Sequence, residues 1–468
     1  MSTTLIKYLQ DKGFGQISDT MDSYIELWKS WYQGYVKDFH SYTIWNGQKR
    51  IPRTMASLQL GKTICETWAN LLFNEKCSIV IDDKATDEFI NQVFDDNNFW
   101  IKINESQEQK AALGTVCYIP YAKGVSVERN GAIIGADRIV MNYVNAEKIK
   151  PLSWENGVIN ELAVMSAHTV GGIKYIYMQL FLLGDDGNYV TENHIFKEDG
   201  FVEYELTDVQ GFENIPPFVN SGSPIKPFVI DRLNIANNID MDSPFGISVF
   251  ANAIDSMKLC DTIFDSSRNE FVLGRKRVMV TAEALKIGNG EPTFDPNDIA
   301  YYAIESKSTQ ADREPFVKEL NTDLRTTEHQ EALQQGLNTF SSQCGLGENY
   351  YRYNADGAAT ATQVISENNT MFRTLKKHEI ILEAVLVDLI RLIINIGKNI
   401  LKEPLNEDAK ITIQFDDSVI EDKNAEWVRL MQEASAGFIS REFYLGKRYG
   451  VTEEDAREMM PKASEREY

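Results

Sequence analysis

The sequence contains few residues that build metal sites or disulfides. Its 468 residues include five cysteines and five histidines. The cysteines form no Cys-x-x-Cys pair and are odd in number, and the histidines form no His-Glu-x-x-His motif. We therefore expect free, buried thiols in a reducing compartment, with neither a disulfide framework nor a zinc site. No residue pattern predicts a cofactor.

A long uncharged apolar run is also missing. The best candidate for a membrane span, residues 379–397, carries Glu383, Asp388 and Arg391. A charge at the centre of such a helix costs about 2.5 to 3.5 kcal/mol, so three charges make insertion unfavourable. On a helix they share one arc of roughly 140°, which predicts a helix buried on most sides by protein. We expect no membrane partner.

The first residues, MSTTLIKYLQDKG, show no basic stretch followed by an apolar run. A secretory signal is therefore not expected, and synthesis and assembly are expected in the host cytoplasm.

Basic residues are outnumbered by acidic ones, 47 to 69, for a formal net charge of -22. The acids are spread along the chain. Such a field repels nucleic acid and anionic lipid at long range, so any contact with DNA must be local or weak. With 43% hydrophobic residues, the chain can bury the cores of roughly three domains.

The triplet Gly61-Lys62-Thr63 matches the last three letters of a phosphate-binding loop. The full motif needs a glycine five residues before the second one, where this chain has Ala56, and it needs a strand before the loop. The preceding stretch TMASLQL is interpreted as helical. Since no Gly-x-Ser-x-Gly elbow is present either, the sequence predicts a protein that is not an enzyme.

In the first half of the chain, helical patterns give way to alternating ones. Tyr24, Trp28, Trp31 and Tyr35 are spaced as on one packed helix face, which we favour over a ligand cage. Further helices are predicted over 57–75 and in two stretches up to 113, with a strand at 77–81. From 115 to 230 the pattern of period two, broken by turns such as residues 184–187, indicates antiparallel hairpins.

Beyond the proline-rich residues 215–228 the pattern is mainly helical. A 28-residue helix is expected over 246–273, with Asp261 and Arg268 in register with an apolar stripe that should pack the stem. The stripe consists of Phe250, Ile254, Met257, Phe264 and Phe271. A small excursion with strands then leads to a helix over 323–343, capped by Thr322 or Asp323. A much longer helix, about 359–401, and a strand at 411–415 follow, so the fold class is α+β.

Two stretches have side chains suited to contacts with a partner or with DNA. Arg275, Lys276 and Arg277 follow the helix over 246–273; they either stabilise its C-terminus through the macrodipole or contact DNA or a protein. A later loop combines aromatic faces with a cation and suits either transient contact with nucleic acid or a packed aromatic turn. Its residues are Tyr350, Tyr351, Arg352, Tyr353, Asn354 and Asp356.

This order of elements resembles the portal proteins of tailed bacteriophages, especially of phages that infect Gram-positive bacteria. The similarity covers nearly the whole chain. The matching stretches, in the expected order, are WYQGYVKDFHSY, LQLGKTICETWANLLFNEK, SPFGISVFANAIDSMKLCDTIFDSSRNEFVLGRKRVMV, GAATATQVISENNTMFRTLKKHE and ITIQFDDSVIEDKNAE.

The resemblance implies the portal fold, with seven parts along the chain. They are a mixed α/β wing (1–245), stem helix 1 (246–273), a small clip (274–322), stem helix 2 (323–345), a tunnel loop facing DNA (346–357), a long wing helix with a strand (358–416) and a helical crown (417–468).

The resemblance also implies the function. Portal proteins form a ring of twelve subunits at one capsid vertex of the virion, with double-stranded DNA passing through the tunnel during packaging and ejection. The implied partners are further copies of the chain, the terminase large subunit, the head-tail adaptor, and the major capsid and scaffold proteins. A nucleotide-binding or DNA-modifying enzyme, or another structural phage protein such as a minor head or adaptor component, remains as an alternative.

Overall fold

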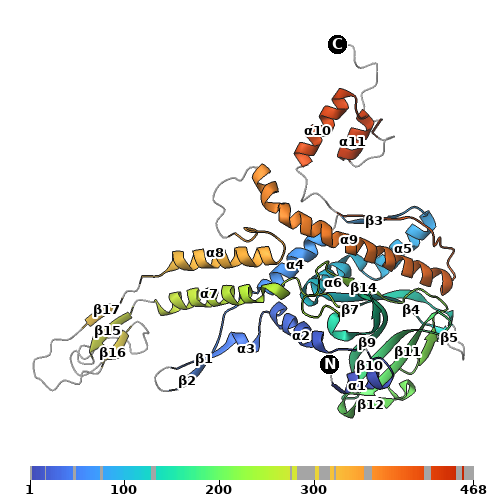
Figure 1. The fold of residues 1–468 in the computed structure, drawn as a ribbon, viewed down its shortest axis with the longest axis horizontal. Coiled ribbons are helices and arrows are strands. Elements are labelled where there is room, and N and C mark those ends of the chain that lie inside the picture. The colour runs from blue at the N-terminus through green and yellow to red at the C-terminus, as the bar shows by residue number, and fades with distance from the viewer. Residues whose placement is uncertain are drawn as a thin grey trace, which may run out of the picture.

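The structure is a computed structural model. It describes residues 3–15, 17–45, 49–73, 77–127, 133–274, 277–281, 301–304, 317–320, 323–352, 361–415, 423–449 and 456–457. A broad α/β body lies at one end of the molecule, and two long helices project from it and lead to a small sheet (Figure 1). The mixture of helices and antiparallel strands confirms the expected α+β class.

Helices form one part of the body. They are α1 (Thr3–Asp11), α2 (Thr20–Tyr32), α3 (Lys37–His40), α4 (Leu60–Leu72), α5 (Lys84–Asp96) and α6 (Phe99–Leu113). The predicted aromatic face is confirmed at Trp28 and Trp31, which are buried. Tyr24 is 38% exposed, and Tyr35 lies beyond the end of α2 and is 47% exposed. The seam therefore covers only part of the predicted stripe.

The antiparallel sheets of the body confirm the hairpins predicted over 115–230. The larger sheet has the order β12-β11-β10-β9-β8, with β13 also on β11, and a smaller one has the order β14-β4-β7. Their bounds are β4 (Thr115–Lys123), β7 (Arg138–Asn145), β8 (Ile149–Glu155), β9 (Val158–Val170), β10 (Ile173–Leu183), β11 (Tyr189–Lys197), β12 (Val202–Tyr204), β13 (Phe218–Asn220) and β14 (Val229–Arg232). A short pair, β5 (Ser126–Val127) and β6 (Ile133–Gly135), lies beside them.

The first projecting helix, α7 (Ile254–Leu273), is shorter than predicted. Its 20 residues span about 30 Å. Residues 246–250 are not helical because Gly246 packs directly on the Gly114 backbone, where a Cβ at Gly246 would lie 2.3 Å from the Gly114 carbonyl oxygen. Nearby, the Val249 N–H donates to the Ala111 carbonyl at 2.9 Å. This segment is committed to the body, and a 3-10 turn (Ala251–Ala253) separates it from α7.

The second projecting helix, α8 (Thr326–Gln343), packs along α7. The predicted cap is wrong at Asp323, because the N-cap residue is Arg325 and no side chain caps the helix; Thr322 lies outside the described residues. The predicted apolar face is confirmed, since Leu333, Leu337 and Phe340 are buried.

Three short strands lie beyond the two helices. They are β15 (Arg277–Thr281), β16 (Tyr301–Ile304) and β17 (Val317–Leu320), in the order β16-β15-β17. The first two confirm the strands predicted in this excursion.

The long helix α9 (Ala361–Asn399) runs across the body, and β18 (Ile411–Gln414) pairs with β3 (Ser78–Ile81). Glu383, Asp388 and Arg391 are exposed while their apolar neighbours are buried, as the sequence predicts. Within the described part of the chain, no helix is long and apolar enough to cross a bilayer. Two helices, α10 (Lys423–Ala436) and α11 (Arg441–Tyr449), follow.

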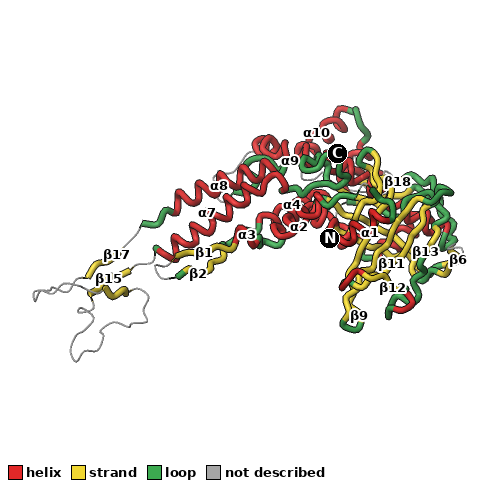
Figure 2. The backbone as a smooth tube through the Cα atoms, turned by 60° about the horizontal axis from the view of Figure 1, so that its bottom comes forward, coloured by secondary structure: helices red, strands yellow, loops and turns green. Residues whose placement is uncertain are grey.

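A two-stranded hairpin stands apart from these sheets. It consists of β1 (Ser41–Trp45) and β2 (Arg50–Thr54), and it lies along α7 on the side away from α8 (Figures 1 and 2). The sequence analysis did not anticipate it.

Candidate functional site

The Gly61-Lys62-Thr63 triplet lies in the first turn of α4, after β2 and a loop over residues 55–59. The prediction that TMASLQL is helical is therefore wrong. A strand, a loop and a helix N-terminus do follow one another here, which is the order that a phosphate-binding loop requires. The decisive observation is what the loop and the triplet already bind.

Backbone N–H groups of this loop donate to carboxylates of α7. The Leu58 N–H donates to Asp261 Oδ1 at 2.7 Å, and the Ala56 N–H donates to Asp265 Oδ1 at 3.0 Å. Both aspartates are at most 5% exposed. Such N–H groups bind phosphate in a nucleotide-binding loop. Here they bind the chain's own carboxylates.

Each residue of the triplet has a structural role. A Cβ at Gly61 would lie 2.7 Å from the Trp31 carbonyl oxygen, so the glycine allows α2 and α4 to pack closely. Lys62 forms ion pairs with Glu108 and, at 3.7 Å, with Glu66. The Thr63 hydroxyl donates to the Gln59 carbonyl at 3.3 Å. The geometry therefore supports a packing role for these residues.

The same aspartates fix the base of the β1–β2 hairpin. His40 Nδ1 accepts a hydrogen bond from the Val36 N–H at 2.8 Å, so the proton is on Nε2, which donates to Asp261 Oδ2 at 3.0 Å. Tyr42 donates its hydroxyl proton to Asp265 Oδ2 at 3.3 Å. We name His40, Asp261 and Asp265 the stem clamp.

The sequence analysis placed Asp261 on the packed stripe of α7 but assigned no role to the clamp. The available signal was the spacing of Asp261 and Asp265, one turn apart and following Met257 on the same face. Of the predicted stripe, Phe250 and Met257 are buried, Ile254 and Phe264 are half-buried, and Phe271 is 54% exposed. The packing role of Phe271 stays a prediction.

An ion pair joins the two projecting helices near their outer ends. Arg325 donates to Glu270 through Nε at 3.1 Å and Nη2 at 2.8 Å. This paired guanidinium lowers the pKa of Glu270 to about 2. The contact fixes the start of α8 against the end of α7.

The predicted basic cluster is described only at Arg277, where β15 begins. Arg275 and Lys276 lie outside the described residues. The structure brings Arg277 to the outer end of α7, next to the small sheet (Figure 1). A contact of this cluster with DNA or a protein stays a prediction.

The predicted DNA-facing loop begins directly after α8. The Tyr351 hydroxyl lies 3.2 Å from that of Thr67, its carbonyl accepts from Gln334 at 2.8 Å, and burial raises the pKa of its phenol. Tyr351 thus packs against the body, in accordance with the packed-turn alternative. Tyr350 is 37% exposed and Arg352 is exposed. Tyr353, Asn354 and Asp356 lie outside the described residues.

Two buried ionic clusters lie within the body. Lys110 donates to both Asp231 oxygens, at 2.9 and 3.1 Å, and the Tyr118 hydroxyl donates to Asp231 Oδ2 at 3.0 Å. His378, on α9, accepts from the Asn234 N–H at 3.0 Å, and burial together with nearby Lys110 lowers its pKa to about 3. All four side chains are paired internally, which supports a structural role.

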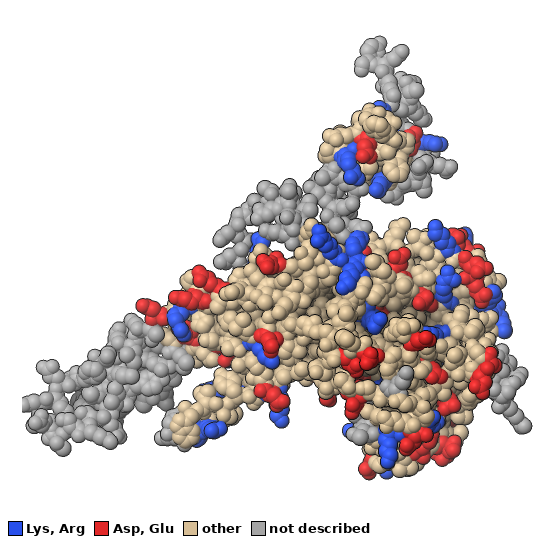
Figure 3. Space-filling model, in the orientation of Figure 1, with Lys and Arg blue, Asp and Glu red and all other residues tan. Residues whose placement is uncertain are grey.

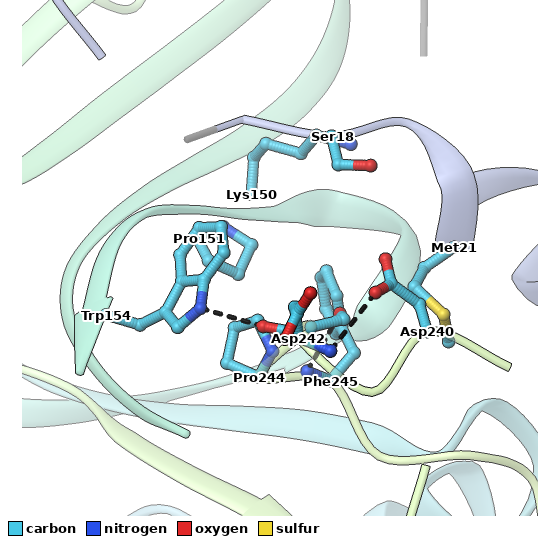
Figure 4. Close-up of a pocket in the computed structure, with 10 residues that line it drawn as sticks. Ser18, Met21, Lys150, Pro151, Trp154, Asp240, Asp242, Pro244 and Phe245 are labelled. Atoms are coloured by element: carbon cyan, nitrogen blue, oxygen red, sulfur yellow. Dashed lines mark hydrogen bonds between the residues drawn. The ribbon is translucent and has the colours of Figure 1, made fainter. Parts of the chain in front are cut away.

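A cavity of about 150 Å³ lies between α2, β8 and the loop over residues 240–245 (Figure 4). Lys150 at its edge donates to both oxygens of Asp22 at 2.9 Å, and the Trp154 indole N–H donates to the Asp242 carbonyl at 2.9 Å. Sites for small molecules usually measure about 300 to 1,000 Å³. This cavity is too small for a nucleotide, and its lysine is already neutralised.

All five cysteines are free and buried, as expected. Among the described residues, no group of three or more His, Cys, Asp or Glu side chains is arranged to hold a metal ion.

The comparisons with known proteins address the whole chain. A family model described as "Phage portal protein, SPP1 Gp6-like" matches residues 16–467. No curated protein matches the chain. One similar solved structure is described as the virion of a native gene transfer agent particle, with 11% identity, a TM-score of 0.44 and coverage of 96% of this chain and 99% of the other. A second, the neck of an empty gene transfer agent particle computed with C6 symmetry, gives 12% identity, a TM-score of 0.47 and coverage of 95% and 98%.

Proposed function

The chain belongs to the SPP1 Gp6-like family of phage portal proteins, and we propose that it forms a ring of twelve copies at one capsid vertex through which double-stranded DNA passes during packaging and ejection. The observation that carries this proposal is the family match over residues 16–467. In the proposed virion the ring is the connector between head and tail, and its assembly takes place in the host cytoplasm.

The elements of the structure suit the parts of such a ring. We assign the α/β body (1–245) to the wing, α7 and α8 to the stem, and residues 274–322 with their small sheet to the clip. The tunnel loop is 346–357, α9 and β18 return through the wing, and 417–468 form the crown. The supporting geometry is the pair of helices that carries the small sheet well away from the body (Figure 2).

The charge of the chain supports passage over binding. Each copy has a formal net charge of -22. A ring of such chains repels the DNA backbone, whereas each phosphate that it neutralised would add salt-dependent affinity and slow the movement of the DNA. Arg352 and Tyr350, at the start of the tunnel loop, are the described residues that we place closest to the DNA.

The proposed partners of the clip are the terminase large subunit and the head-tail adaptor, and those of the wing and crown are the major capsid and scaffold proteins. The cluster Arg275, Lys276 and Arg277 carries the first of these assignments, because three adjacent cations next to an exposed helix end suit an acidic partner surface or DNA. Alanine at all three positions is expected to weaken DNA packaging in a complementation assay. Unchanged packaging would leave only a role at the helix end.

Negative-stain imaging of the purified chain tests the proposal. We expect rings with a central hole. Particles without a ring or a hole would overturn the proposed function.

A further inference from the structure

The β1–β2 hairpin is held firmly at its base and left without a covering element at its tip. Its base contacts the stem clamp, and the Met55 N–H closes it by donating to the His40 carbonyl at 2.8 Å. Toward the tip, Trp45 is 65% exposed and Ile44 is 40% exposed. Buried carboxylates therefore position a hairpin whose apolar end faces solvent in the single chain.

An exposed two-stranded hairpin is a poor structure by itself. Isolated hairpins are marginally stable at best in water, and their edges present unpaired backbone groups. Every described residue of β1 and β2 except Tyr42 and Ile51 is exposed. Such a hairpin gains most by packing against another surface.

A second surface with the complementary character lies on the other flank of the projecting helices. We name Phe271, Val272, Leu324, Glu328 and Glu331 the stem patch. Phe271 is 54% exposed, Val272 47% and Leu324 39%, and both glutamates are exposed. It lies where α7 ends and α8 begins, so apolar and acidic side chains occur together.

The charges of the two surfaces are opposite. The hairpin carries the exposed residues Arg50 and Arg53, and Arg50 lies directly across the strand pair from Trp45. The stem patch offers Glu328 and Glu331 on one face of α8. Figure 3 shows acidic side chains near the outer end of α8 and basic ones on the hairpin. Opposite charges around an apolar centre are typical of specific interfaces.

The placement of the two surfaces suits a ring. Closed rings use heterologous contacts, in which one flank of a subunit meets the opposite flank of the next. The hairpin and α8 lie on opposite sides of α7, and the hairpin's tip reaches the level of the outer end of α7 in both views (Figures 1 and 2). Rotation about an axis along the stem preserves that level.

We propose that the β1–β2 hairpin of one copy docks on the stem patch of the neighbouring copy, with Trp45 and Ile44 against Phe271, Val272 and Leu324, and with Arg50 and Arg53 paired to Glu328 and Glu331. This inference rests on the proposed function, because it needs copies arranged in a ring. It gives the stem clamp a further role, which is to aim the hairpin at its neighbour.

Charge reversal tests the docking. The double variant Arg50→Glu with Arg53→Glu should shift the particle mass, measured by mass photometry, from rings to smaller species. Adding Glu328→Arg and Glu331→Arg to the same chain should restore rings, because the pairs are rebuilt with exchanged signs. A matched control, Lys84→Glu with Lys174→Glu, makes the same charge change at exposed positions away from both surfaces and should leave rings intact. Circular dichroism checks that each variant is folded.

The outcomes separate the two proposals. Wild-type protein that forms no ring contradicts the proposed function and the docking with it. Wild-type rings together with unaffected rings of the double variant contradict the docking alone. Rings that are lost in the double variant and not regained in the fourfold variant also contradict it, since the stated pairing predicts recovery.

A crosslinking measurement gives an independent readout. All native cysteines are buried and free, so introduced thiols react with little background. Trp45→Cys with Leu324→Cys, treated with a short bis-maleimide, should give a ladder of covalent multimers. Trp45→Cys with Asp186→Cys, which places the second thiol on the β10–β11 turn, should not. Equal ladders in both variants would overturn the docking.

Discussion

His40 donates a hydrogen bond from Nε2 to Asp261 Oδ2 at 3.0 Å, and both side chains are buried although 221 positions separate them in the chain. The same carboxylate accepts the Leu58 N–H. One aspartate of α7 thus holds together the hairpin base, the loop before α4 and the first projecting helix. This contact explains why a strand, a loop and a Gly-Lys-Thr helix start occur here without forming a nucleotide site.

Asp261→Ala should destabilise the chain strongly. The change leaves the Leu58 N–H and the His40 Nε2–H buried without an acceptor, and each unsatisfied donor costs about 1 to 3 kcal/mol. We expect a clear drop in melting temperature by scanning fluorimetry. Asp255→Ala is the control, since that side chain is on the same helix and is 95% exposed. Equal melting temperatures for the two variants would contradict the clamp.

Gly61→Ala should destabilise the body through backbone crowding. The added Cβ would lie 2.7 Å from the Trp31 carbonyl oxygen, so α2 and α4 must separate, at a cost of about 1 to 3 kcal/mol. Gly135→Ala is the matched control, because no heavy atom lies within 4 Å of the Cβ position there. A stable Gly61→Ala protein would show that the glycine is not needed for close packing.

Lys62→Ala should leave nucleotide behaviour unchanged. Because the loop N–H groups bind Asp261 and Asp265, we expect neither ATP hydrolysis nor a nucleotide-dependent rise in melting temperature in the wild type or in the variant. The loss of its partly exposed ion pairs should cost at most about 1 kcal/mol. Hydrolysis that disappears in the variant would support the enzyme alternative.

His378 should make stability depend on pH. Burial lowers its pKa from 6.5 to about 3, so between these values the unfolded chain binds a proton that the folded chain does not. The free energy of unfolding therefore falls as the pH drops below about 6.5, by up to about 1.4 kcal/mol per pH unit, until the pH reaches about 3. His378→Asn should lose less stability than the wild type between pH 7 and pH 5. His168→Asn, at an exposed position, should lose as much as the wild type.

Periodic patterns allowed much of the fold to be predicted. The apolar stripes of α4, α8 and α9 and the alternation in β4 to β11 are local signals, and the structure bears them out. The start of α7 could not be predicted in this way. The sequence from 246 onward has a helical pattern, but the close approach of Gly246 to Gly114 holds it on the body.

The candidate site was harder to predict because its contacts are non-local. Ala56 and Leu58 bind aspartates that lie 209 and 203 positions away. The β1–β2 hairpin lacks the buried alternation that identifies most strands, since both of its faces are largely exposed. Tyr350, Tyr351 and Arg352 share one local pattern, yet Tyr351 alone is drawn into the body by Thr67 and Gln334.

The central claim, a ring that conducts DNA, is tested most directly by a cryo-electron microscopy reconstruction of the purified assembly. The account predicts a closed ring of twelve copies, with α7 and α8 around an axial channel wide enough for duplex DNA and with Tyr350 and Arg352 on the channel wall. A closed particle without an axial channel, or a ring with these two residues on its outer surface, would contradict it.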